Sequence, residues 1–142
     1  LARKFSDVDL FNLSFTPPEQ IEKLHAQLSA MSPTWNRARL PRTVLVFIDR
    51  DRKKARELAN FVLDAYIEAM KGTAQVPDKA VLMERALIGD AAEVRDQLHP
   101  DNPRRFDPND RLMLWFEFNQ LDHAQITNQM RYFWKEVGEK LA

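Results

Sequence analysis

The chain has 142 residues, enough for one domain with a hydrophobic core and too few for two ordinary domains. Its 21 lysines and arginines balance 21 aspartates and glutamates, so no net positive field attracts nucleic acid or an anionic membrane surface. There is no cysteine, which excludes disulfides, thiolate metal ligands and cysteine nucleophiles. The sequence contains no apolar run of about 18 residues, and we expect a cytoplasmic protein without nucleic-acid or membrane partners.

A first strand and helix are predicted between residues 8 and 31. Apolar residues at 8–13 indicate a short strand, and Asn12 and Ser14 stand near its carboxyl end. A T-x-x-E capping box starts at Thr16, with proline at the first helical position. The helix that follows has one apolar face, formed by Ile21, Leu24, Leu28 and Met31.

The second strand is predicted at residues 43–48, where six β-favouring residues follow one another without a charge. Asp51 or Asp49 is placed to cap the next helix, and Gly72 stands where a glycine ends a helix. The apolar face of this helix contains Ala55, Leu58, Ala59, Val62, Tyr66 and Met70.

The stretch between the second and third strands contains two shorter helical segments. One is predicted at residues 79–87. The other has Asp90 as its N-cap and Glu93 as its capping-box partner, and it ends by His99 because a proline follows. Residues 99–110 contain three prolines without periodicity and are predicted to form an exposed loop.

The third strand and helix are predicted at residues 111–141. Both faces of the strand are apolar until Glu117, as in covered strands of parallel sheets. The row that we expect to face the helix layer contains Leu112, Leu114, Phe116 and Phe118. The inner row contains Met113, Trp115, Glu117 and Asn119. Asp122 and Gln125 form a capping box, and the helix face contains Ile126, Met130, Phe133, Trp134, Val137 and Leu141.

Three strands that are each followed by an amphipathic helix predict an α/β fold with parallel pairing. Right-handed crossovers connect such strands. We therefore expect the strands at 8–14, 43–48 and 112–118 to be neighbours in sequence order, with the three long helices on the same outer face.

Familiar sites for metals and nucleotides are missing from the sequence. His25, His99 and His123 lie far apart, so we expect surface histidines and no metal site. The glycine-rich motifs of dinucleotide-binding and phosphate-binding loops do not occur. The aromatic residues near the carboxyl end stand at strand and helix spacing, and such residues usually belong to the core.

Four polar residues are candidates for ligand binding because of their place in the fold. Ligands of parallel α/β folds bind at the carboxyl ends of the strands. The residues predicted at those ends are Asn12, Ser14, Glu117 and Asn119. The alternative interpretation is that they close the strands and bond to neighbouring backbone.

The order of four segments resembles the C-terminal third of luciferase-like flavin-dependent monooxygenases. They are SDVDLFNLSFTPPEQIEKL, a D-x-x-x-A-x-x-x-A helix at Asp51, LIGDAAEVRDQL, and LMLWFEFNQLDHAQITNQMRYFWKEV. The similarity is greatest over Ile88-Gly89-x-x-x-Glu93-Val94 and over residues 112–137, with an M-x-x-F-x-x-x-V helix face. The proline-rich loop at 99–110 departs from the pattern of that family.

The resemblance implies that residues 1–142 are a single fragment of a (β/α)₈ TIM barrel, containing its sixth, seventh and eighth units. A complete barrel needs roughly 250 residues. The family implies an oxidoreductase that binds reduced flavin (FMN), or a deazaflavin, over the strand ends and uses dioxygen to oxidise a small organic substrate. Asn12, Ser14, Glu117 and Asn119 would then lie near the flavin.

Because five barrel strands are missing from such a fragment, we do not expect these residues alone to catalyse. They should self-associate or associate with the rest of the barrel. The alternative hypothesis is a non-catalytic α/β interaction or structural module, or a flavoenzyme-derived subunit that has lost its site.

Overall fold

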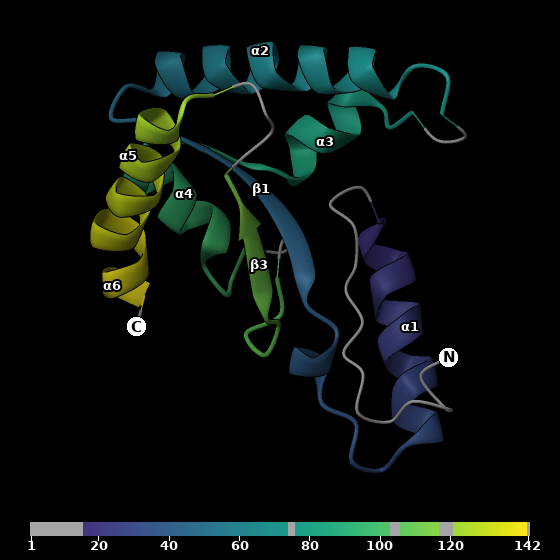
Figure 1. Ribbon diagram of the computed structural model, residues 1–142. Coiled ribbons are helices and arrows are strands. Elements are labelled where there is room, and N and C mark those ends of the chain that lie inside the picture. Colours follow the sequence, from purple (N-terminus) through teal and green to yellow (C-terminus); the bar gives the residue numbers. More distant parts are fainter. Residues whose placement is uncertain (1–15, 74–75, 103–105, 117–120, 142) are drawn as a thin grey trace.

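The structure is a computed structural model that describes residues 16–73, 76–102, 106–116 and 121–141 (Figure 1). Its elements are α1 (Pro18–Met31), the 3₁₀ turn η1 (Arg37–Arg39), β1 (Arg42–Ile48), α2 (Arg52–Met70), α3 (Lys79–Arg85), β2 (Leu87–Gly89), α4 (Ala91–Leu98), β3 (Leu112–Trp115), α5 (His123–Phe133), the π-helical segment η2 (Trp134–Gly138) and α6 (Glu139–Leu141). None of the helices in these ranges combines the length and apolarity needed to cross a bilayer.

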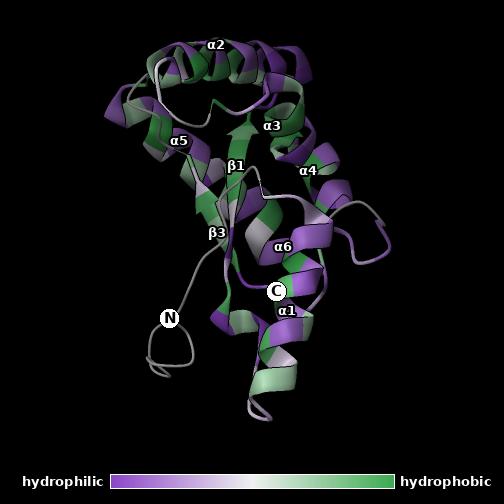
Figure 2. Cartoon of the chain, turned by 90° about the vertical axis from the view of Figure 1, so that its right-hand side faces the viewer, coloured by the Kyte–Doolittle hydropathy of each residue, from purple (hydrophilic) through white to green (hydrophobic). Residues whose placement is uncertain are grey.

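The described strands form a parallel sheet with β1 at its centre. The strand order is β2-β1-β3. β3 pairs with the first part of β1, from Arg42 opposite Leu112 to Leu45 opposite Trp115. β2 pairs with the last three residues of β1. Figure 2 shows β1 as a hydrophobic strand among more hydrophilic helices. The predicted α/β class, the parallel pairing and the adjacency of the strands at 43–48 and 112–118 are confirmed, whereas the strand predicted at 8–14 lies outside the described residues.

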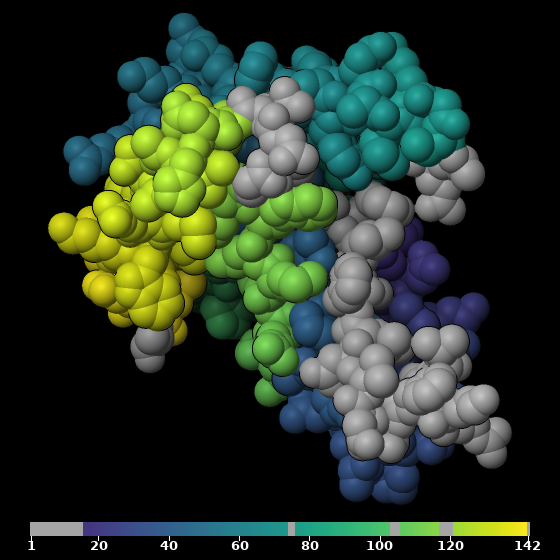
Figure 3. All heavy atoms as spheres, viewed as in Figure 1, coloured from purple at the N-terminus to yellow at the C-terminus, as the bar shows by residue number. Residues whose placement is uncertain are grey.

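Helices cover both faces of β1. Side chains alternate between the two faces of a strand, and Leu45 and Phe47 pack against α2 and α3. Val44, Val46 and Ile48 pack instead against α4, α5 and η2. The expectation that the long helices share one outer face is therefore wrong for α2 and α5. Figure 3 shows α2 and α3, in blue to teal, at one end of the molecule.

The two faces of β3 differ as predicted. Phe116, which follows β3, is buried against Phe133 of α5, and Leu112 and Leu114 pack into the same core cluster. Met113 and Trp115 are on the other face and are 42% and 39% exposed. The predicted assignment of side chains to the two faces of this strand is therefore confirmed from Leu112 to Phe116.

The strand β2 was not predicted. It contains three residues, Leu87–Gly89, which are too few to show a hydrophobic period. The helix predicted at 79–87 ends at Arg85 because the chain then extends to pair Leu87 with Val46. This pairing is a tertiary contact that local sequence does not specify.

Three predicted helix caps are confirmed and one is wrong. Asp51 caps α2, and the capping boxes of Asp90 with Glu93 and of Asp122 with Gln125 are both formed. α1 is preceded by Pro17, without a side-chain cap, rather than by Thr16. A residue before proline is held out of the helical region. Since Pro18 follows, Pro17 is extended and the helix begins one residue later than expected.

The buried side of α5 is rotated from the predicted face. Gln129, Phe133 and Val137 are buried, whereas Met130, Trp134 and Leu141 are exposed. The buried residues therefore follow one another every four positions from Gln129, and Met130 is not among them. The wider turn of η2 then changes the angular position of the residues that follow it, including Leu141.

Candidate functional site

A cleft in the described structure lies at the carboxyl end of β1, between α2 and α5. Its volume is about 860 Å³, within the roughly 300–1,000 Å³ of small-molecule sites. β1 ends at Ile48, and Asp51 turns the chain into α2 by accepting a hydrogen bond from the Lys53 N–H at 2.8 Å. The first half of α2 thus lies above the strand end, next to α5 (Figure 1). Carboxyl ends of strands are where parallel α/β folds bind ligands.

Gln129 of α5 forms the inner end of the cleft. Its side chain is buried, and its Oε1 atom accepts a hydrogen bond from the Ile48 N–H at 3.4 Å. This contact joins α5 to the end of the central strand. Sequence reasoning missed Gln129 because a glutamine between apolar helix positions has no local signal of burial.

One wall of the cleft is apolar. It includes Leu58 and Phe61 of α2 and Leu121, which precedes the cap of α5. Phe61 is 60% exposed, so much of its ring is open to solvent. The wall therefore offers a surface on which a ring system can pack.

The polar residues of the cleft, which come from both of its sides, include several cations. Arg50 places its guanidinium 5.8 Å from the centre of the Tyr132 ring. The further basic residues that line the cleft are Lys54, Arg131 and Lys135. Its acidic residues are Asp49, Glu57 and Glu136. Hydrogen bonding to Lys140, together with its charge, lowers the pKa of Glu136, so this carboxylate is ionised at neutral pH.

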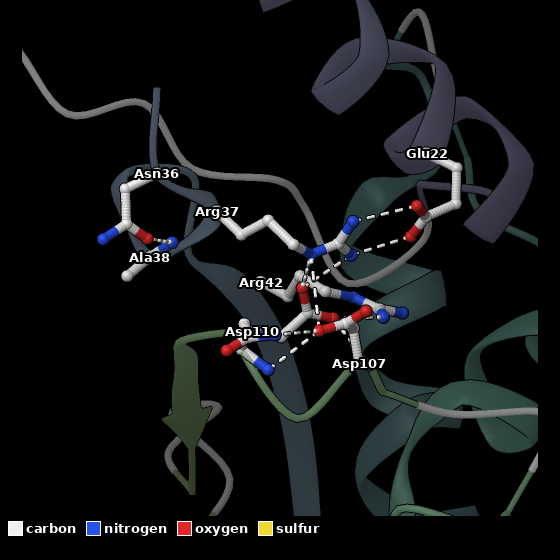
Figure 4. A network of polar contacts seen from close by, with 8 residues as sticks. Glu22, Asn36, Arg37, Ala38, Arg42, Asp107 and Asp110 are labelled. Atoms are coloured by element: carbon white, nitrogen blue, oxygen red, sulfur yellow. Dashed lines mark hydrogen bonds and ion pairs between the residues drawn. The ribbon is translucent and has the colours of Figure 1, made fainter. Parts of the chain in front are cut away.

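A second polar cluster lies at the opposite end of β1 (Figure 4). Arg37 bonds both carboxylate oxygens of Glu22 on α1, at 2.8 and 2.9 Å, and also bonds Asp110 at 2.8 Å. Arg42 of β1 donates to the other oxygen of Asp110 at 3.1 Å. These bonds join α1, η1, β1 and the segment before β3.

The charges of this cluster are mutually stabilised. Hydrogen bonding from Arg37 lowers the pKa of Glu22, and the same bond raises the pKa of Arg37. The pKa of Asp107 is lowered chiefly by the Asn109 backbone N–H. The side chain of Asp110 is only 1% exposed and lies between two guanidinium groups. Because the amino ends of parallel strands usually serve stability, we assign this cluster a structural role.

His25 lies beside that cluster and is not the surface residue that was expected. It is 5% exposed, and its ring centre is 6.1 Å from that of Trp35. Among the described residues, neither ring nitrogen has a hydrogen-bond partner. Burial, followed by the charge of Arg37, lowers its pKa, so the ring is neutral. His99 and His123 are exposed, as expected.

The four predicted ligand-binding residues, Asn12, Ser14, Glu117 and Asn119, lie outside the described residues. In the ranges that the structure covers, no three His, Cys, Asp or Glu side chains are grouped so that they could hold a metal ion. The residues that form the cleft were not predicted as a site, because α2 and α5 meet there only through tertiary packing.

No protein-family model matches this sequence, and no curated protein matches it. Among solved structures, the chain is similar to the monooxygenase RslO1 from Streptomyces bottropensis, with a TM-score of 0.72 and 17% sequence identity. The alignment covers 93% of this chain and 41% of that one. At this identity the likeness shows a shared α/β fold. The chain thus corresponds to about two fifths of the length of that monooxygenase.

Proposed function

We propose that this chain is part of a luciferase-like flavin-dependent monooxygenase, and that the cleft between α2 and α5 is part of its ligand site. The observation that carries the proposal is the place of the cleft, at the carboxyl end of the central strand of a fold shared with a monooxygenase. When bound, reduced flavin supplies the electrons for the reaction of dioxygen with a small organic substrate.

The described residues fit a flavin in chemical terms. Leu58 and Phe61 offer an apolar surface for the ring system, and Lys54 and Arg131 offer cations for a phosphate. Gln129 holds α5 against β1 and so fixes the width of the cleft. These residues would bind and orient the ligand, since none of them is an obvious proton donor or acceptor at neutral pH. A deazaflavin, which carries a similar ring and phosphate, fits the same description.

We propose that the strands belong to a (β/α)₈ barrel in which β1 and β3 are consecutive strands. Their direct parallel pairing supports this. Asn12, Ser14, Glu117 and Asn119 remain proposed flavin neighbours. In the intact protein, Glu117→Gln should weaken reduced-flavin binding at an unchanged melting temperature. Unaltered binding, or unfolding, would make Glu117 a scaffold residue.

The face of Met113 and Trp115 is proposed to be covered by the rest of the barrel or by a second copy of the chain. Both side chains are large, apolar and substantially exposed. Sedimentation of this chain by itself should therefore show association. A monodisperse monomer that melts cooperatively would argue for a self-sufficient module.

A non-catalytic α/β module is the second candidate, and one observation favours it. α2 and α3 cover Leu45 and Phe47, on the same face as Trp115 of the neighbouring strand. In a regular barrel helices cover the outer face only, so this packing departs from that of a complete barrel.

The experiment that separates the two is an anaerobic titration of the intact protein with reduced FMN, followed by ¹⁸O₂ and a set of small aldehydes, ketones and phenols. We expect saturable binding and a product that carries one ¹⁸O atom, the second oxygen leaving as water and the electrons coming from the flavin. If neither reduced FMN nor a reduced deazaflavin binds in such a titration, the hypothesis of a non-catalytic α/β module is correct.

A further inference from the structure

We propose that the cleft between α2 and α5 binds the anionic group, a phosphate or a carboxylate, of a ring-bearing organic ligand. Lys54, Arg131 and Lys135 would contact the anion. The ring would lie on the wall of Leu58 and Phe61. The inference rests on the proposed function only where the ligand is a flavin, because an aromatic carboxylate substrate has the same chemistry.

The acidic residues of the cleft are each engaged elsewhere. The Asp49 carboxylate accepts a hydrogen bond from the Asp51 N–H at 2.9 Å. Glu57 is 3.7 Å from the Nζ atom of Lys53, and Glu136 is 2.7 Å from that of Lys140. Lys53 and Lys140 do not line the cleft. The charges of Glu57 and Glu136 are thus offset by cations outside the cleft, whereas Asp49 is held by a backbone N–H.

The positive charges of the three basic residues are not offset in this way. Lys54 is on α2, Arg131 on α5 and Lys135 on η2, so they come from two sides of the cleft. In the part of the chain that the structure describes, none of the three side chains makes a hydrogen bond or ion pair. Lysine and arginine are charged at neutral pH. The cleft therefore has a local excess of positive charge, although the chain as a whole is neutral.

The apolar wall narrows the class of anion. An inorganic ion would leave Leu58 and the exposed Phe61 facing water, whereas a ligand with an aromatic body would cover them. Arg50 over Tyr132 adds a flat polar surface at the same cleft. An anion that carries a ring would contact the basic side chains and also cover the apolar surface of Leu58 and Phe61, which is why we favour it over free phosphate.

The test compares two pairs of probes that differ in charge and share a ring: FMN with riboflavin, and 2-naphthoate with 2-naphthol. Calorimetric titration of the intact protein should show the anionic member of at least one pair binding about tenfold more tightly. The double variant Lys54→Gln, Arg131→Gln should remove that preference. Lys23→Gln, an exposed lysine of α1, is the control and should retain it. Higher salt should weaken only the anionic probe.

The outcomes separate this inference from the proposed function. A preference for FMN supports both. Equal binding of FMN and riboflavin, with no preference for naphthoate, overturns the anion site and leaves flavin binding intact. A preference for naphthoate without any flavin binding supports the anion site and contradicts the flavin. A preference that survives in the double variant, or no binding of any probe, overturns the inference.

Discussion

The Oε1 atom of Gln129 accepts a hydrogen bond from the Ile48 N–H at 3.4 Å, beyond the point where β3 pairs with β1. The N–H of Arg42, on the same edge of β1, bonds to the Arg111 carbonyl beside β3. At the start of β1 the N–H groups of this edge thus bond to the backbone beside and within β3, and at its end a side chain of α5 supplies the acceptor. The floor of the cleft depends on this contact.

Gln129→Leu should destabilise the protein by about 1–3 kcal/mol, because it leaves the buried Ile48 N–H without a partner. Urea denaturation measures the loss. Asn128→Leu makes the same kind of change at an exposed neighbouring position and should shift stability by less than about 0.5 kcal/mol. Equal losses in the two variants would show that the contact does not stabilise the fold.

Gly89→Ala should be more damaging than Gly72→Ala. Both glycines have positive φ, at +144° and +89°. A Cβ at Gly89 would lie 2.1 Å from the Glu93 Oε2 atom, which accepts the Asp90 N–H in the capping box of α4, whereas nothing lies within 4 Å at Gly72. Backbone strain costs about 1–3 kcal/mol at each site. Thermal melts should show the extra loss at Gly89, and similar losses would mean that Glu93 moves aside freely.

Asp110→Asn should cost about 1–3 kcal/mol, because it removes the buried negative charge that Arg37 and Arg42 share, although Arg37 keeps its pair with Glu22. Asp101→Asn is a matched control, since its side chain is 92% exposed. Equilibrium unfolding of the two variants gives the comparison. A loss at Asp110 no greater than at Asp101 would exclude a structural role for the cluster in Figure 4.

Stability should fall as the pH is lowered below 6.5, in part because of His25. Its folded-state pKa is lowered from that value, first by burial and then by Arg37. The unfolded state therefore binds a proton that the folded state excludes, and stability rises with pH through this window. His25→Phe should flatten the dependence between about pH 6.5 and 5, and the exposed control His99→Gln should retain it. Parallel slopes for wild type and His25→Phe would show that another group titrates.

Local signals in the sequence predicted much of the fold. β1 was predicted from six consecutive β-favouring residues, and the caps at Asp51, Asp90 and Asp122 from short-range hydrogen bonding that needs no distant partner. β2 was missed because its three residues are too few to show a period, and they are extended only because they pair with β1.

The cleft could not be predicted for the same physical reason. Lys54 and Arg131 are 77 residues apart by their numbers, and each looks like an ordinary solvated charge on its own helix. Only the packing of α2 and α5 around the end of β1 brings them to one cleft. His25 lies four residues after the buried Ile21 and so on the buried side of α1, although its polarity favoured a surface position.

Hydrogen exchange of the intact protein with and without FMN tests most directly whether the flavin binds at the carboxyl end of β1. The account predicts slower amide exchange over residues 48–61 and 121–136, which contain all the residues that line the cleft, and unchanged exchange over residues 18–40. Protection confined to 18–40, or no protection at saturating FMN, would contradict it.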